Sequence, residues 1–142
     1  MPSASWSLHP QLNADTVRVG DLQLSRLLLS KDGNFPWLIL VPRRPGAVEL
    51  IDLAAPDRSQ LTSEIDTAGR ALKTVTSCDK LNIAALGNMV PQLHVHIIAR
   101  STTDAAWPRP VWGAVPPRPY ADSDLARLLA ALRSSLGNDL SP

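Results

Sequence analysis

The run from Asn88 to Arg100 places Gln92, His94 and His96 two residues apart among apolar residues. In a β-strand, side chains point alternately to the two faces of the sheet, so these three are predicted to share one face while the intervening apolar residues pack on the other. Two adjacent imidazoles on an apolar strand have to be solvated or hydrogen-bonded, and they repel one another when charged. The pattern therefore indicates a strand with one face for packing and one for function.

Size and composition limit the classes of protein that fit. The chain has 142 residues, of which 44% are hydrophobic, so it is long enough for one core and too short for two. Its net charge is +1 and its basic residues are scattered, without the basic stripe that duplex nucleic acid requires. A single cysteine excludes an internal disulfide, and we see no export segment and no apolar run of about 20 residues for a membrane span. We expect a cytoplasmic protein with no nucleic-acid partner and no membrane partner.

Hydrophobic periodicity predicts strands and one main helix before the histidine run. Residues 16–20 and 23–30 are typical of a β-hairpin, and the proline-bounded run 35–42 is apolar on both faces, which favours a central buried strand. Apolar residues at three- and four-residue steps predict a helix over 58–77. Residues 82–86 predict a short strand that leads into the histidine strand.

The last third of the chain is predicted to be a connector followed by a helix. Residues 107–120 contain five prolines and lack the backbone donors for a helix or a central strand. Beyond them, Asp122 can cap a helix with a stripe of leucines, and Gly137 can end it. We expect residues 1–120 to form the main domain and residues 121–142 a C-terminal helical extension packed on it.

Three interpretations compete for His94 and His96. A metal site lacks further ligands, since His9 is distant in sequence, Cys78 lies near the end of the main helix and no carboxylate is close by. Inert core histidines would be unusual, because two on one face beside Gln92 both need partners. A catalytic pair explains the most residues: one imidazole attacks as a nucleophile and the other donates a proton or binds the oxygens of the group attacked. We expect no metal and no cofactor.

The heptapeptide Gln92-Leu93-His94-Val95-His96-Ile97-Ile98 resembles the signature His-φ-His-φ-His-φ-φ, with φ apolar, of the histidine triad (HIT) superfamily of nucleotide hydrolases and transferases. The predicted order of elements from about Asp15 to Arg100 also follows that family. The resemblance implies an α+β fold, HIT-like, with an antiparallel sheet of about five strands, one main helix and an extra C-terminal helix outside the matching part. It also implies a homodimer formed by joining sheets.

The resemblance assigns roles position by position. His94 matches the histidine that attacks the α-phosphorus of a nucleotide and forms a covalent nucleotidyl-histidine, which water then cleaves. To attack, its ring has to be neutral, with a backbone carbonyl fixing the tautomer through the other nitrogen. His96 matches the histidine that contacts the phosphate oxygens and the leaving group. Asn88 falls where members place an amide or hydroxyl against the phosphate, although Gly-Asn is also a common turn pair.

Further substrate contacts are implied in two loops. Asp32 or Asn34, in the break before the central strand, occupies the region that supplies an acceptor for a ribose hydroxyl in relatives. Trp107-Pro108 and Trp112-Gly113 lie where some members carry a Trp-Pro segment that approaches the active site, sometimes that of the partner subunit. We therefore include Trp112 among the substrate-binding residues.

Two positions depart from the family pattern. Gln92 replaces the first histidine of the triad, and Trp37 stands where several relatives carry a further histidine. Gln92 cannot titrate, but its amide can hydrogen-bond and its backbone carbonyl can still orient His94, so we count it with His94 and His96 as catalytic. Our first hypothesis is a metal-independent nucleotide phosphohydrolase or transferase acting on a nucleoside phosphoramidate or a dinucleoside polyphosphate. The alternative is a catalytically weak nucleotide-binding or interaction module.

Overall fold

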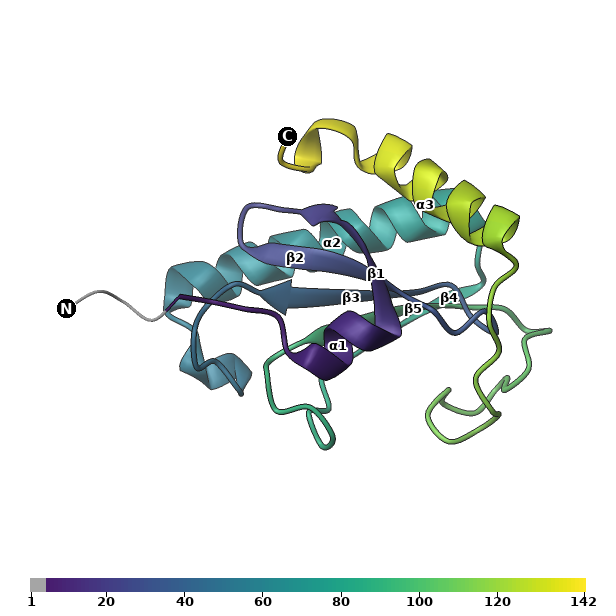
Figure 1. Cartoon of the computed structure of the whole chain (residues 1–142), viewed down its shortest axis with the longest axis horizontal. Helices are drawn as coiled ribbons and strands as arrows, with labels where there is room; N and C mark the ends of the chain where they lie inside the picture. Colours follow the sequence, from purple (N-terminus) through teal and green to yellow (C-terminus); the bar gives the residue numbers. More distant parts are fainter. Residues whose placement is uncertain (1–4) are drawn as a thin grey trace.

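One antiparallel sheet forms the centre of the protein. The computed structural model describes residues 5–142, and its five strands are arranged in the order β1-β2-β3-β5-β4 (Figure 1). Every neighbouring pair in this sheet is antiparallel. The predicted α+β class is confirmed. The strands are β1 Thr16–Asp21, β2 Ser25–Ser30, β3 Trp37–Pro42, β4 Lys80–Ala84 and β5 Val95–Arg100.

The central strand β3 is buried on both faces, as its unbroken apolar sequence predicts. It pairs with β2 on one side and with β5 on the other. Leu38 and Leu40 point into the main core, whereas Ile39 and Val41 belong to a second apolar cluster on the opposite face. Successive side chains alternate between faces, so this strand separates the two halves of the molecule.

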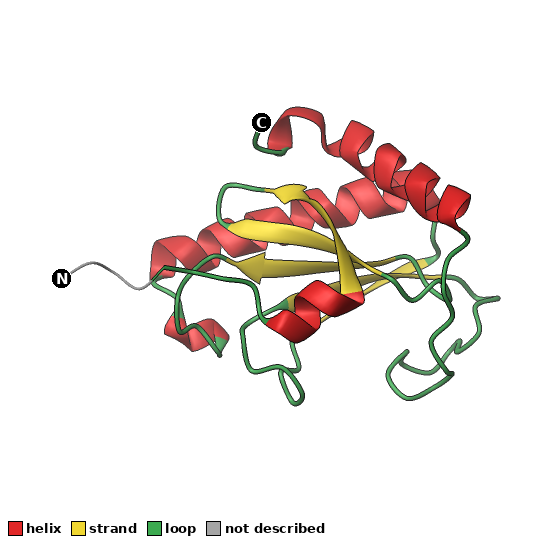
Figure 2. Ribbon diagram, viewed as in Figure 1, coloured by secondary structure: helices red, strands yellow, loops and turns green. Residues whose placement is uncertain are grey.

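The long helix α2, Ala55–Thr76, covers the face to which Leu38 and Leu40 point (Figure 2). It begins three residues before the predicted start, with Pro56 in its first turn, where the missing N–H costs no hydrogen bond. Leu61 and Leu72 are buried against the sheet, each worth about 1.5–3 kcal/mol of apolar burial. This helix is the main packing element of the core.

The C-terminal helix α3, Asp122–Leu136, lies against α2 and β1. Leu132 and Leu136, from the predicted leucine stripe, are buried in the main core. Ala121 rather than Asp122 is the N-cap, and Asp122 lies inside the first turn, where a carboxylate suits the positive end of the helix dipole. Gly137 ends the helix at a φ of 51°, as its position predicts. The two short 3₁₀ helices are η1 Leu50–Asp52 and η2 Gly137–Asp139.

The opposite face of the sheet carries a helix that sequence patterning did not predict. This helix, α1, spans Pro10–Asp15 and lies across the front of the sheet in Figure 2. Its Leu12 packs with Ile39 and Val41, and the preceding Trp6 and Leu8 pack against the same cluster. Six residues are too few to show a helical period, so local pattern could not reveal it.

The predicted extent of the histidine strand is wrong at its start. Strand β5 begins at Val95, so Gln92 and His94 precede it. The N–H of Leu93 donates to the carbonyl of Ala47, which lies in a loop and not in a strand. Only His96 therefore projects from the regular sheet.

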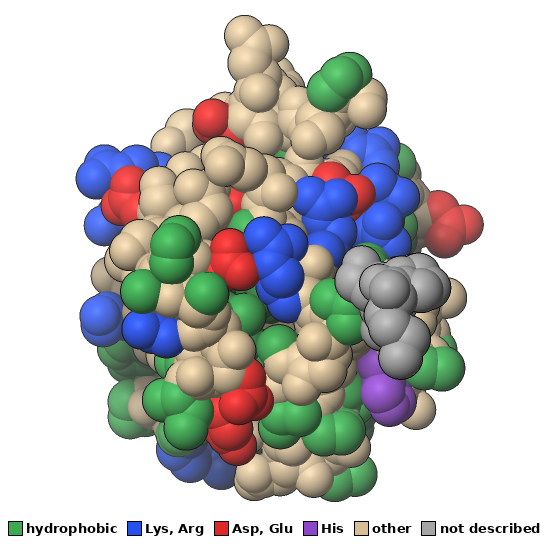
Figure 3. Space-filling view, turned by 90° about the vertical axis from the view of Figure 1, so that its left-hand side faces the viewer, with side chains coloured by type: hydrophobic (Ala, Val, Ile, Leu, Met, Phe, Trp, Pro, Cys, Tyr) green, Lys and Arg blue, Asp and Glu red, His purple; other side chains and the backbone are tan. Residues whose placement is uncertain are grey.

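Charged side chains on the surface occur in mixed groups. Figure 3 shows acidic side chains next to basic ones on the face that it displays. The buried Asp21 forms ion pairs with Arg18, Arg26 and Arg43 below this surface. Burial raises the pKa of its carboxyl, but the three arginines outweigh that effect and hold the pKa below its usual value. Within residues 5–142, no helix is long and apolar enough to cross a membrane.

A buried carboxylate on α2 holds the hairpin turn, and its removal should destabilise the fold. Glu64 is buried and accepts hydrogen bonds from the backbone N–H groups of Leu24 and Ser25, at 2.7 and 2.9 Å. Glu64→Ala leaves both donors buried without an acceptor, so we expect a loss of about 2–4 kcal/mol in the free energy of unfolding, measured by urea denaturation. Asp66→Ala removes an exposed ion pair from the same helix and should cost under about 0.5 kcal/mol. Equal losses in the two variants would contradict the role of Glu64.

Candidate functional site

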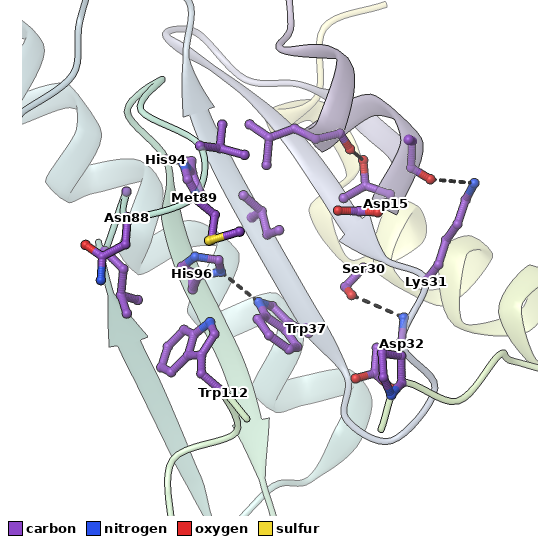
Figure 4. A pocket seen from close by; sticks show the side chains of 18 of the residues that line it. Asp15, Ser30, Lys31, Asp32, Trp37, Asn88, Met89, His94, His96 and Trp112 are labelled. Atoms are coloured by element: carbon purple, nitrogen blue, oxygen red, sulfur yellow. Dashed lines mark hydrogen bonds between the residues drawn. The ribbon is translucent and has the colours of Figure 1, made fainter. Parts of the chain in front are cut away.

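A large cavity opens on the α1 face of the sheet. Its volume is about 810 Å³, and its walls come from α1, the end of β2, the turn over residues 86–90 and the connector around residues 112–119. His94 and His96 both line it. Figure 4 shows the two rings on one side and Asp15, Lys31 and Asp32 on the other. The cavity is thus large enough for a nucleotide-sized ligand, with the imidazoles on one side.

The backbone of residue 92 fixes the ring of His94. The Nδ1 atom of His94 lies 2.7 Å from the carbonyl oxygen of Gln92. A carbonyl only accepts hydrogen bonds, so Nδ1 carries the proton, and in the neutral ring Nε2 keeps its lone pair. No side chain or backbone group within residues 5–142 hydrogen-bonds to that Nε2 atom. His94 therefore presents an unprotonated nitrogen next to the cavity.

The opposite tautomer is fixed in His96. The indole Nε1–H of Trp37 donates to Nδ1 of His96 at 2.9 Å, so this Nδ1 is an acceptor and the proton of the neutral ring is on Nε2. Burial, with the neighbouring His94 as a smaller cause, lowers the pKa of His96 to about 4. His96 is therefore a neutral hydrogen-bond donor at physiological pH.

Aromatic rings enclose the two histidines. The ring centroids of His94 and His96 are 4.9 Å apart, and Trp112 stands edge-on to His96 at 5.1 Å (Figure 4). Trp112 also meets Trp37 at 5.8 Å in a T-shaped contact. Because Trp112 comes from the proline-rich connector, this segment forms part of the wall of the cavity.

A buried arginine anchors the loop that leads to Trp112. Arg100, at the end of β5, is 1% exposed and pairs with Asp104 at 2.8 Å. Its guanidinium also lies over the rings of Phe35 and Trp107. Arg100 and three backbone N–H groups hold the pKa of Asp104 at about 2, although burial alone would raise it. The connector therefore starts from a rigid, fully paired anchor.

The side chain of Gln92 lies with the N-terminal arm on the α1 side of the sheet, but it does not line the cavity of the two histidines. Its Nε2 donates to the carbonyl of Ser7 and its Oε1 accepts from the N–H of His9, both at 2.9 Å. The residue precedes the regular strand, so strand alternation does not govern its direction. The backbone of Gln92 thus contacts His94, whereas its side-chain amide contacts the N-terminal arm, residues 5–9.

The arm held by Gln92 leads directly into a wall of the cavity. The ring of His9 caps α1 by accepting from the N–H of Gln11 at 3.0 Å. Leu12, Ala14 and Asp15 of α1 then line the cavity. Gln92, which stands at the position of the first triad histidine, therefore helps to hold α1 in place.

The remaining predicted residues fall at different places. Asn88 lines the cavity beside the highly exposed Met89. Asp32 lines the far side, and its Oδ1 accepts from the backbone N–H groups of Asn34 and Arg118 and from the side-chain amide of Asn34. Asn34 does not line the cavity, because its amide also donates to the carbonyl of Pro116 and braces the connector. The structure brings Asn88, Asp32 and Trp112 to the cavity of the histidines and leaves Asn34 outside it.

Sequence patterning missed several residues of the cavity wall. Leu12 and Asp15 come from the unpredicted α1, and Arg118 comes from the connector. Lys31 precedes Asp32 but gave no signal of its own, and its Nζ donates to the carbonyl of Ala14. No group of three or more His, Cys, Asp or Glu side chains suited to a metal ion occurs within residues 5–142.

Comparisons with known proteins agree on the family and the fold. The profile of the HIT domain matches residues 11–103. A histidine triad protein from Bradyrhizobium japonicum is 58% identical, with a TM-score of 0.92 over 94% of this chain and 99% of its own. A histidine triad protein from Marinobacter aquaeolei is 41% identical, with a TM-score of 0.92 over 97% and 100% of the two chains. A HIT protein from Sinorhizobium meliloti is 38% identical, with a TM-score of 0.89 over 92% and 96%. No curated protein matches the chain.

The amide of Gln92 should stabilise the N-terminal arm. Gln92→Ala removes two long-range hydrogen bonds, so we expect a loss of about 1–3 kcal/mol in the free energy of unfolding and faster proteolysis within residues 5–15. Gln11→Ala removes an exposed bond to Asp15 within the adjoining α1 and serves as the matched control, with a loss under about 0.5 kcal/mol. Urea denaturation and limited proteolysis measure the two effects. Indistinguishable variants would show that Gln92 does not hold the arm.

Burial of neutral His96 should make the stability depend on pH. The pKa of His96 is lower in the folded protein than in the unfolded chain, where it is near 6.5. Below pH 6.5 the unfolded chain binds a proton that the folded protein does not, so this contribution is complete above pH 6.5 and is lost as pH falls towards 4. Between pH 7 and 4.5, the wild type should lose about 2 kcal/mol more stability than His96→Gln. Parallel pH profiles from urea denaturation would contradict this prediction.

Proposed function

This chain belongs to the HIT domain family, a superfamily of nucleotide-binding proteins and hydrolases, and we propose from this premise that it is a metal-independent nucleotide hydrolase or transferase. The proposed substrate is a nucleoside phosphoramidate or a dinucleoside polyphosphate. The reaction breaks the P–N or P–O bond at the α-phosphate through a nucleotidyl intermediate on His94.

The observation that carries this proposal is the 2.7 Å contact between His94 Nδ1 and the carbonyl of Gln92. It leaves the lone pair of His94 Nε2 beside the cavity, which is what nucleophilic attack on phosphorus requires. In the first step, Nε2 forms a bond to the α-phosphorus and the bond to the leaving group breaks, with its electron pair departing on that group. The ring then carries a positive charge, which the Gln92 carbonyl stabilises through the proton on Nδ1.

Water completes hydrolysis in the second step. Its oxygen forms a bond to phosphorus, the N–P bond breaks and His94 Nε2 recovers its electron pair, while a proton of the water passes to solvent. The products are a nucleoside monophosphate and the free enzyme. If a second phosphate or an alcohol replaces water, the same step transfers the nucleotidyl group.

The other residues around the cavity bind substrate in this proposal. The Nε2–H of His96 donates to a phosphate oxygen next to His94, and the amide of Asn88 reaches the same group from the turn. Asp32 accepts from a ribose hydroxyl on the far side, where its Oδ2 has no hydrogen-bond partner within residues 5–142. Trp112 contacts the ligand from the connector.

The homodimer implied by the resemblance remains part of the proposal. Strand β4 lies at the edge of the sheet, and its Ile83 is 51% exposed. An edge strand with an exposed apolar residue is suited to pairing with a second sheet. A cytoplasmic location and the boundary at residue 120 also remain expectations.

The position of Gln92 favours one other function. Because its side chain is engaged by the N-terminal arm, the first triad position contributes only a backbone carbonyl to the site. A protein with this arrangement could bind nucleotides with little turnover. The two functions differ in whether His94 changes the rate of reaction.

Turnover and adduct formation test the proposal. We expect the wild type to hydrolyse a nucleoside phosphoramidate or a diadenosine polyphosphate, and His94→Ala to lose at least about 1,000-fold in kcat, because the nucleophile is removed. Mass spectrometry of the wild type quenched during turnover should find a nucleotidyl group on the peptide that contains His94. Nucleotide binding by calorimetry, with equal turnover in the wild type and His94→Ala, would favour the binding module.

A further inference from the structure

The hydrogen bond between Trp37 and His96 restricts the chemistry of the site. An indole nitrogen only donates, so Nδ1 of His96 has to remain an acceptor for as long as this 2.9 Å bond exists. A proton can be bound at Nδ1 only if the bond from Trp37 breaks. The cationic form of His96, which would be the natural acid beside the phosphate, is therefore opposed by geometry as well as by burial.

Within residues 5–142, the ring neighbours of His96 and its partners across the sheet offer no acid other than His94. They are His94, Trp37, Trp112, Ile39 and Ala84. His94 is the only titratable group among them, and its Nδ1 proton is directed to the carbonyl of Gln92. The cavity wall also carries four charged residues, Asp15, Lys31, Asp32 and Arg118. Figure 4 places Asp15, Lys31 and Asp32 across the cavity from His94.

We propose that Trp37 is a positioning residue that holds His96 as a neutral Nε2–H donor, and that the site is thereby specific for phosphoanhydrides over phosphoramidates. This inference rests on the proposed function and narrows its substrate class. His96 then binds the phosphate oxygens with a hydrogen bond and does not deliver a proton to the leaving group.

The two substrate classes differ in what the leaving group needs. When His94 Nε2 attacks an anhydride, the P–O bond breaks and the electron pair leaves on a phosphate oxygen, which is stable as an anion at neutral pH. When it attacks a phosphoramidate, the P–N bond breaks and the nitrogen has to gain a proton to leave as a neutral amine. A site in which His96 donates a hydrogen bond but delivers no proton to the leaving group therefore favours cleavage of the anhydride.

The tautomer of His96 is tested by nitrogen-15 NMR of the imidazoles. In the wild type at pH 6–8, we expect a neutral His96 with its proton on Nε2. Trp37→Phe keeps a ring in place but removes the donor, so the signals should shift to a mixture of the two tautomers. Trp112→Phe, which alters the other indole against His96, should retain the Nε2–H form. A wild-type His96 that is cationic or protonated on Nδ1, or a tautomer unchanged in Trp37→Phe, would overturn the inference.

Kinetics test the substrate class. We expect the wild type to have a kcat/KM for diadenosine tetraphosphate about 100-fold or more above that for an adenosine alkylphosphoramidate, the range that a general acid normally contributes. Trp37→Phe should narrow this ratio by about tenfold and give the phosphoramidate reaction a new dependence on pH below 6. Equal or faster cleavage of the phosphoramidate by the wild type would refute the preference. Failure to cleave either substrate would overturn the proposed function together with the preference, whereas NMR alone decides the tautomer.

Discussion

Two imidazoles lie 4.9 Å apart at one end of a mostly apolar cavity, and both have to remain uncharged or be paired. The protein meets this constraint by giving each Nδ1 atom one partner of opposite kind. A backbone carbonyl accepts from His94, and an indole N–H donates to His96. The two rings therefore adopt complementary tautomers, one with a free lone pair and one with a free proton.

These two partners depend on the fold in different ways. The carbonyl of Gln92 is available because the segment before β5 leaves the sheet, with Leu93 bonded to Ala47 and not to β3. The indole of Trp37 is available because β3 pairs with β5, so that Trp37 and His96 lie on neighbouring strands. The irregular start of β5 thus leaves this carbonyl outside the strand and next to Nδ1 of His94.

Sequence periodicity predicted the elements that bury apolar faces. The hairpin, the central strand, the main helix and the leucine-striped α3 all follow from it, because packing against one core imposes a regular spacing. It failed where the backbone is held by single long-range bonds. The amide of Gln92 turns to the arm because the carbonyl of Ser7 offers it an acceptor and the N–H of His9 a donor, and no local pattern encodes such a contact. For the same reason the wall formed by α1 had no signal and the connector was indicated only by the resemblance, through Trp112, whereas His94 and His96 were identified by their spacing.

The neutral state of His96 matters most after the first bond to phosphorus has formed. His94 then carries a positive ring, and a second positive ring at 4.9 Å would oppose its formation. A donor that stays neutral gives the phosphate a hydrogen bond without that repulsion. Because His96 stays neutral, it also lacks the additional proton that an amine would need in order to leave. By holding His96 neutral, Trp37 on β3 therefore affects both the stability of the intermediate and the kind of bond that the site can break.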